Sequence, residues 1–490
     1  MLEGLEGYSG SLAGNYSQQD VEALYKAMSA GDLRGGDPAG VSGSALKVES
    51  LENTVKILTA KSQHTPFFTK IAKKPATNTV EEYNQLVSYG NFDGGFTLEG
   101  ELPEGSDSVY QRKSQLIKYL GVTGGVTHPM QLVQTGSGIS NMLATETQNK
   151  VRLMTQLLEG YLPFSDSRIV PEQFKGFMEQ HETETGFATL GQYLASDIVI
   201  DCRGKVLTDT DIEHGSLSIV NRYGIADTLI GPPRVFSNFV TKYHDKKMIY
   251  PIPSMVRDGV FGQRVNEVIT QNGGVEIVQS NFFQFSKVKR TSSPATSSKS
   301  PATPVADGLT PCAAVTDSTT KFNDGAGDYF YAVSAKNRFG ESALCPLGTL
   351  TAVATTEAVD LKFTAGTGVS EVATGFCIYR SKVDPTGTIA DTDLYKLFEI
   401  PVTALATGYN GAAAGKVRDK NYFLPDTDQA MMVEWDADQV LAWKQLAPMM
   451  KMNLAVTAPI QRFMVLCYGT AILYAPGKMV RFINVGNALS

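Results

Sequence analysis

Residues 80–122 constrain the fold of this chain more than any other segment, because they predict a long two-stranded ribbon that cannot be stable alone. The outgoing strand is expected at residues 80–89 and the returning strand at 109–122, with a tip at 91–108. An isolated hairpin is only marginally stable in water, and side-chain alternation along the returning strand gives neither face a clean apolar surface. The ribbon is therefore expected to rest on another protein surface.

The tip of the predicted ribbon is acidic and pliable. It contains four glycines, which loosen its backbone, and no lysine or arginine. Its acidic residues are Asp93, Glu99, Glu101, Glu104 and Asp107. The stem carries the basic residues Arg112, Lys113 and Lys118. Opposite charges of this kind suit a contact between subunits, whereas a solvated charged loop explains each single residue equally well.

The first part of the chain, residues 1–78, is expected to form an arm. A short helix is predicted from Ser17, a glycine-rich hinge at residues 31–43, and a second helix from Ser50. Short amphipathic helices between flexible linkers cannot bury their apolar stripes alone, so we expect the arm to dock on a neighbour. A poorly ordered tail is the alternative. It is disfavoured by the apolar stripe Val21, Leu24 and Met28.

The middle of the chain predicts a mixed α/β body. Its longest helical pattern covers residues 139–162 and would run about 35 Å. A shorter helix is expected to begin after Thr208, with Asp211 completing a capping box. Three further elements are expected: a helix at residues 234–243 and closing strands at 462–474 and 478–485.

A change of composition marks an inserted β-sandwich. Residues 291–304 form a linker of Ser, Thr and Pro. Strands are then expected at short spacing, at residues 329–335, 348–354, 359–363, 375–380 and 394–400. Short strands separated by turn residues are typical of a small sandwich. Residues 328–342 and 373–381 resemble strands of fibronectin type III and related immunoglobulin-like modules.

Three other segments resemble large-phage capsid proteins, namely residues 50–83, 198–215 and 221–239. Together with the order of elements, they make the chain similar to the Hong Kong 97-type major capsid proteins of tailed phages, over most of its length outside the sandwich. This resemblance implies an α+β fold with an N-terminal arm, an extended loop, a spine helix, and peripheral and axial domains. An all-β immunoglobulin-like insertion, a recurring feature of such proteins, is expected in addition.

The resemblance also implies a division of the chain into six parts. These are the N-terminal arm (1–78), the extended-loop ribbon (79–128), the peripheral domain with its spine helix (129–190), the axial and peripheral core (191–290), the immunoglobulin or fibronectin III-like insertion (291–425), and the axial-domain end with the closing peripheral strands (426–490).

The function implied is that of a major capsid protein. It would self-assemble into hexamers and pentamers of an icosahedral or prolate head around double-stranded phage DNA, after assembly in the host cytoplasm. Its expected partners are other copies of itself, decoration or cement proteins, the portal, the scaffold and, without sequence specificity, the packaged DNA.

An encapsulin-like compartment is the first alternative, since it shares the fold. A carbohydrate-active enzyme with an accessory β module is a remote one, because such enzymes use a carboxylate pair in an aromatic-rich cleft, and the chain has only two tryptophans.

Composition excludes several other classes. The 490 residues carry a net charge of −7, which argues against tight binding of nucleic acid over the whole surface. The five cysteines are odd in number and include no CxxC pair, so free thiols are expected rather than disulfides or zinc ligands. The first fourteen residues have neither a basic start nor an apolar run, so no signal peptide is expected. No segment reaches the apolar length of a membrane span.

No catalytic, cofactor-binding or metal-binding residue is predicted. The nearest approach to a phosphate-binding loop, residues 411–416, has the wrong spacing and lacks the final Ser or Thr. His181 and Glu182 beside Glu184 are residue types that can bind a metal, but a solvated acidic stretch is the favoured interpretation. Some members of the resembled family crosslink a ribbon lysine to an asparagine of a neighbour. Lys113 and Lys118 lie in the corresponding region, and no residue pattern establishes the reaction.

Overall fold

A computed structural model describes residues 59, 64–90, 96, 98–102, 105, 107–133, 141–184, 198–243, 265–283 and 299–486, except 309, 323–324, 368–370, 386, 388 and 457. The arm helices predicted from Ser17 and Ser50 lie outside these residues. So does the first part of the predicted linker, residues 291–298. The predictions made for these segments therefore stay predictions.

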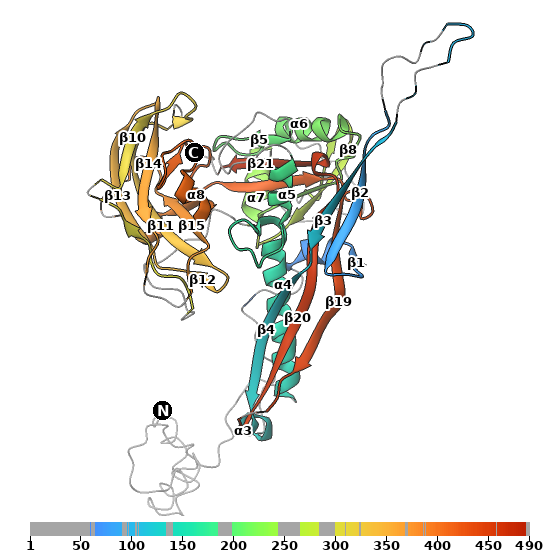
Figure 1. Ribbon diagram of the computed structural model, residues 1–490, viewed down its shortest axis with the longest axis vertical. Coiled ribbons are helices and arrows are strands. Elements are labelled where there is room, and N and C mark those ends of the chain that lie inside the picture. Colours follow the sequence, from blue (N-terminus) through green and yellow to red (C-terminus); the bar gives the residue numbers. More distant parts are fainter. Residues whose placement is uncertain are drawn as a thin grey trace, which may run out of the picture. The chain divides into compact units, whose positions relative to one another are not determined.

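A four-stranded sheet and a long helix form one half of the body (Figure 1). The strands, in spatial order, are β1 (Lys73–Pro75), β19 (Leu441–Asn453), β20 (Ile460–Leu473) and β4 (Lys118–Thr127). β1 is parallel to β19, and the other pairs are antiparallel. The helix α4 (Met142–Phe164) confirms the predicted long helix, although it continues through Pro163. Its buried residues Met154, Leu158 and Leu162 lie in one apolar core with Phe463 and Val465 of β20.

A six-stranded mixed sheet forms the other half. Its spatial order is β5 (Val199–Asp201), β21 (Met479–Val485), β18 (Asp428–Val433), β6 (Thr228–Gly231), β8 (Gly273–Gln279) and β7 (Glu267–Thr270). The helices beside it are α5 (Phe177–Glu184), α6 (Asp209–Val220) and α7 (Pro233–Lys242). Thr208 and Asp211 form the predicted capping box of α6. The closing strands are confirmed as β20 and β21, but they belong to different sheets.

The predicted ribbon exists, and its returning strand is shorter than expected. β2 (Val80–Ser88) pairs antiparallel with β3 (Val109–Leu116). The prediction of one strand over residues 109–122 is wrong, because the chain changes partners at Ile117 and continues as β4 against β20. Ile117 is buried, and its N–H donates to the carbonyl oxygen of Thr79 at 2.9 Å. Two short helices flank this region, α2 (Pro66–Lys70) and α3 (His128–Leu132).

The inserted segment forms two sheets around a core of its own. The first contains β9 (Val305–Ala306), β10 (Cys312–Thr316), β14 (Glu357–Thr364) and β17 (Lys416–Asp419). The second contains β11 (Gly327–Asn337), β12 (Gly340–Glu341), β13 (Cys345–Val353), β15 (Gly375–Arg380) and β16 (Tyr395–Pro401). The module also contains α8 (Val402–Thr407) and the 3-10 turn η6 (Asp391–Asp393), whereas the 3-10 turn η7 (Pro476–Lys478) belongs to the body, between β20 and β21. All five predicted strands are confirmed, whereas the immunoglobulin or fibronectin type of this module stays a prediction.

Polar contacts hold the two-sheet module on the body. The guanidinium of Arg203 donates to the carbonyl oxygens of Asn421 at 3.0 Å and Lys321 at 2.8 Å. The Lys321 ammonium in turn lies 2.9 Å from the carboxylate of Asp201 at the end of β5. These contacts join segments that are more than 100 residues apart in the chain, so they form only when the module is folded.

Candidate assembly site

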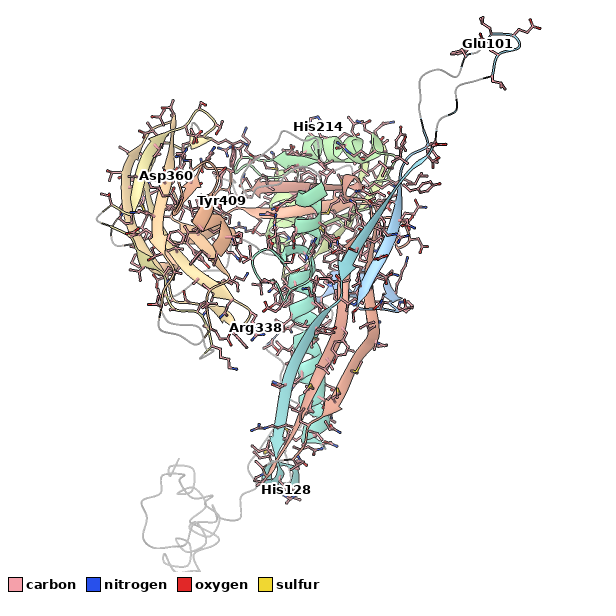
Figure 2. The ribbon with its side chains drawn as sticks, in the orientation of Figure 1. Glu101, His128, His214, Arg338, Asp360 and Tyr409 are labelled. Carbon is pink, nitrogen blue, oxygen red and sulfur yellow. The ribbon has the colours of Figure 1, made fainter. Side chains whose placement is uncertain are left out.

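The ribbon of β2 and β3 carries large apolar side chains that nothing in the described part of the chain covers. Phe96, Leu102 and Tyr89 are 103%, 93% and 86% exposed. The other exposed apolar residues of the ribbon and tip are Leu86, Val87, Leu98, Val109, Tyr110 and Leu116. Figure 2 shows Glu101 at the far end of the ribbon, away from the sheets. Large apolar side chains exposed along one segment make that segment a candidate interaction site.

The base of the ribbon, by contrast, is attached to the body. Alternate residues of β2 point to one face, and three of them make contacts there. The carboxylate of Glu81 lies 2.6 Å from the Lys444 ammonium. The rings of Tyr83 and Tyr474 meet edge to face at 5.0 Å, and the Gln85 amide donates to the Tyr474 carbonyl oxygen. The ribbon is therefore fixed at one end and exposed at the other.

The basic residues of the stem already have contacts within their own chain. Arg112 lies 3.5 Å from the carboxylate of Glu82 and donates to the side-chain oxygen of Asn84 at 3.2 Å. Lys118 is part of β4 rather than of the ribbon and donates to the carbonyl oxygen of Pro171 at 2.6 Å. The sequence predicted a contact between the basic stem of one subunit and the acidic tip of another. Contacts within one chain do not test it, so it stays a prediction.

A buried carboxylate joins the segment that leads to the ribbon with the long helix. Glu159 of α4 accepts hydrogen bonds from the backbone N–H groups of Phe67 at 3.0 Å and Phe68 at 2.7 Å, and from the Ser280 hydroxyl at 2.7 Å. The two N–H groups belong to the first turn of α2, whose N-cap residue Thr65 makes no side-chain cap. Burial raises the pKa of Glu159 against the pull of these bonds.

The acidic sequence around His181 is buried, so the prediction of a solvated stretch is wrong. Glu179, His181 and Glu182 of α5 are all at most 4% exposed. Glu182 pairs with Arg168 at 2.9 Å and with Arg481, and a ring nitrogen of His181 lies 3.0 Å from the Met479 carbonyl oxygen. Burial is the main cause that lowers the pKa of His181, to about 3. Two arginines pair with Glu182, Ser167 donates to Glu179, and α5 is part of the interior.

In the part of the chain that the structure describes, no group of three or more His, Cys, Asp or Glu side chains is arranged to hold a metal ion. None of the described helices is long and apolar enough to cross a membrane. Burial raises the pKa of the Cys467 thiol to about 11, which disfavours the reactive thiolate. Residues 411–416 form a turn that leads into strand β17, not into the helix of a phosphate-binding loop.

Similarity to known proteins agrees with an assembly role. The major capsid proteins of Staphylococcus phages S25-3 and K are each 24% identical to this chain over 454 residues, covering 91% of the chain and 91% of each relative. The putative major capsid protein of Enterococcus phage phiEF24C is 22% identical over 448 residues, covering 90% of both. The chain belongs to the major capsid proteins of tailed phages. As a capsid protein it is a component of the virion.

No protein-family model matches the capsid protein. Among solved structures, the capsid of a native GTA particle has a TM-score of 0.44 at 6% identity and covers 91% of this chain and 98% of its own. The SrpI encapsulin from Synechococcus elongatus has a TM-score of 0.42 at 7% identity, with coverages of 89% and 93%. Similarity at this level adds no argument of its own. The Hong Kong 97-type fold is seen in the chain's own elements: the spine helix α4 beside a four-stranded sheet, the ribbon, and the second sheet.

Two features of the site were missed in the sequence. Glu159 lies within the apolar run of α4, between Leu158 and Leu162. A carboxylate on a buried stripe needs hydrogen-bond partners, so this position could have indicated the contact with another segment. The anchoring of the ribbon by Tyr83 had no such signal, since its partner Tyr474 is 391 residues away.

Proposed function

We propose that this capsid protein self-assembles into hexamers and pentamers of the phage head, and that the exposed ribbon of each copy lies on a neighbouring copy. One observation supports the proposal most directly. The base of the ribbon is anchored on Tyr474, whereas Phe96 and Leu102 at its tip are exposed to solvent. Apolar side chains at such exposure lose free energy when a neighbour covers them, by roughly 25 cal/mol for each Å² buried.

The proposal assigns a structural role to each part of the chain. The segment 1–78 serves as an arm, 79–128 as the extended loop, 129–190 as the peripheral domain with its spine helix, 191–290 and 426–490 as the axial and closing peripheral parts, and 291–425 as the insertion. Permanent interfaces often exceed about 2,000 Å², and an arm and a ribbon reach such areas without a larger core. No catalytic role is assigned to any residue, and the portal, scaffold, decoration proteins and packaged DNA are the proposed partners.

The test is electron microscopy of the purified full-length chain and of a ribbon variant. The variant replaces Phe96, Leu98 and Leu102 by serine. The matched control replaces three exposed valines of the module by serine, namely Val305, Val372 and Val383. We expect shells from the wild-type chain and from the control, and capsomers or single chains from the ribbon variant. Shells formed equally well by the ribbon variant contradict a role for the tip in assembly.

The content of the particle separates a phage head from an encapsulin-like compartment, which shares the fold. We expect particles recovered from infected cells to contain double-stranded DNA that resists added nuclease. Particles that hold only protein cargo support the compartment instead.

A further inference from the structure

We propose that the ribbon tip of a second copy binds in a groove between strand β4 and the turn at residues 337–340 of the two-sheet module, which makes the module part of the assembly machinery. This inference rests on the proposed function, and it assigns the receptor surface for the ribbon. The groove is lined on the body side by the start of β4, Pro171, Phe174 and Trp443, and on the module side by Arg338 and Phe339.

The first supporting observation is an open strand edge. β4 pairs with β20 on one side and ends the spatial order of its sheet, so among the described strands none pairs with its other side. An unpaired edge offers backbone N–H and C=O groups to an added strand. β4 has ten residues, a length of about 33 Å. The first four residues of β4, Lys118–Gly121, line the groove. The tip segment 96–102 spans about 23 Å when extended, so it is long enough to pair with these residues and continue along the strand beyond the groove.

The second observation is apolar surface on both partners. Leu116 and Tyr119 line the groove and are 56% and 63% exposed, although their neighbours in the sheet are packed. The tip offers Phe96, Leu98 and Leu102, which are more exposed still. When the tip binds in the groove, the largest exposed apolar groups of the ribbon are removed from water. This burial is the main source of the association free energy.

The third observation is charge. The tip sequence 91–108 contains five acidic residues and no basic one. The groove carries the cations Lys118 and Arg338, together with one carboxylate, that of Glu172. Arg338 is half exposed, and its ion pairs are long, at 4.0 Å to Glu172 and 3.7 Å to Glu371. Its guanidinium is therefore available to a stronger carboxylate partner such as Glu101.

The module turn is built to hold Arg338 in place. The side-chain oxygen of Asn337 accepts from the N–H groups of Phe339 at 2.9 Å and Gly340 at 3.2 Å, which closes a tight turn. The Arg338 guanidinium lies 4.6 Å from the ring centre of Phe339. A cation stacked on a ring keeps its outer N–H groups for a further acceptor. The turn therefore presents one charge and one aromatic ring to the groove.

Contact is tested by crosslinking between two different chains. One chain carries Glu172→Cys, and the other carries a single cysteine from a scan of residues 98–102; the two are assembled together and oxidised. We expect disulfide-linked dimers on a non-reducing gel at one or two positions of the scan, since a disulfide needs Cα atoms within about 7 Å. Each single variant assembled alone controls for the five native thiols.

The contribution of the module turn is tested by Arg338→Glu with Phe339→Ser. The control is Lys362→Glu with Val383→Ser, which changes the charge by the same amount and removes a smaller exposed apolar group elsewhere on the module. We expect the turn variant to need about tenfold more protein for half-maximal shell formation, and the control to assemble like wild type. Glu101→Arg should restore assembly of the single variant Arg338→Glu.

The outcomes distinguish this inference from the proposed function. Wild-type shells without any tip-to-groove crosslink, together with a turn variant that assembles like its control, overturn the groove and leave the capsid role intact. A wild-type chain that forms no shells overturns both.

Discussion

The carboxylate of Glu159 accepts the backbone N–H of Phe68 at 2.7 Å across 91 residues of sequence. The same carboxylate holds Phe67 and Ser280. It replaces the missing N-terminal cap of α2 and fixes the start of the path that leads through β1 to the ribbon. One buried side chain of the spine helix therefore holds the segment that precedes the ribbon, in addition to the contacts that anchor the ribbon base itself.

Replacing Glu159 by alanine should destabilise the chain. The change leaves two helix N–H groups and one hydroxyl buried without acceptors, at a cost of about 2–4 kcal/mol. The control is Glu146→Ala on the same helix, where the partly exposed pair with Lys150 at 3.1 Å is worth less than about 0.5 kcal/mol. The measurement is the thermal unfolding midpoint of each variant. Equal midpoints for the two variants would show that Glu159 has no structural role.

Acid should weaken the fold through His181. Its pKa of about 3 in the folded chain lies below the usual value of about 6.5, so the unfolded chain binds a proton that the folded chain does not. Stability from this group is complete near pH 7 and is lost as the pH falls, by about 2 kcal/mol at pH 5.

The variant His181→Gln tests this, because it shares every other titrating group with the wild type. We expect the thermal midpoint of the wild type to fall more between pH 7 and pH 5 than that of the variant. Parallel curves would contradict the assignment to His181.

The two-sheet module should depend on Arg380. This residue is fully buried and donates to the Asp419 carboxylate and the Asn421 side-chain oxygen, both at 2.6 Å. Arg380→Met leaves the Asp419 carboxylate buried without its cation, at a cost of about 3–5 kcal/mol. The exposed pair of Lys362 and Asp307 provides the control, since Lys362→Met should cost less than about 1 kcal/mol. Limited proteolysis of the module reports the difference, and equal protection of both variants would refute it.

Gly469 should tolerate no side chain. A Cβ atom at this position of β20 would lie 2.3 Å from the Trp443 ring and 2.8 Å from the Lys444 carbonyl oxygen. Gly469→Ala therefore has to displace the indole or the strand, and a drop in soluble yield and thermal midpoint is expected. Gly105→Ala is the control, because a Cβ there meets nothing within 4 Å. A wild-type midpoint for Gly469→Ala would mean that the sheet adjusts freely around Trp443.

Local features of the fold were predictable because neighbouring residues determine them. The capping box of Thr208 and Asp211 needs residues three positions apart, and the strand at Gly375–Arg380 follows from a short apolar run between turns. The two strands of the ribbon were likewise predicted on either side of a glycine-rich tip, although alternation gave neither face a clean apolar surface. The charge of the tip was also plain from composition alone.

Other features depended on partners that are distant in the sequence. The returning strand breaks at Ile117 because residues before it pair with β2 and residues after it pair with β20, and periodicity does not tell these partners apart. The acidic residues of α5 are buried because Arg168 and Arg481 neutralise Glu182, which no local pattern indicates.

The sequence by itself determined that an acidic, glycine-rich ribbon exists and that it needs another surface. Only the tertiary structure decided that its base is held on Tyr474, that Glu159 fixes the segment before it, and that its apolar tip stays uncovered. The physical reason is the range of the interactions. Turns, caps and alternation arise within a few residues, whereas burial and ion pairing are set by which distant segments meet.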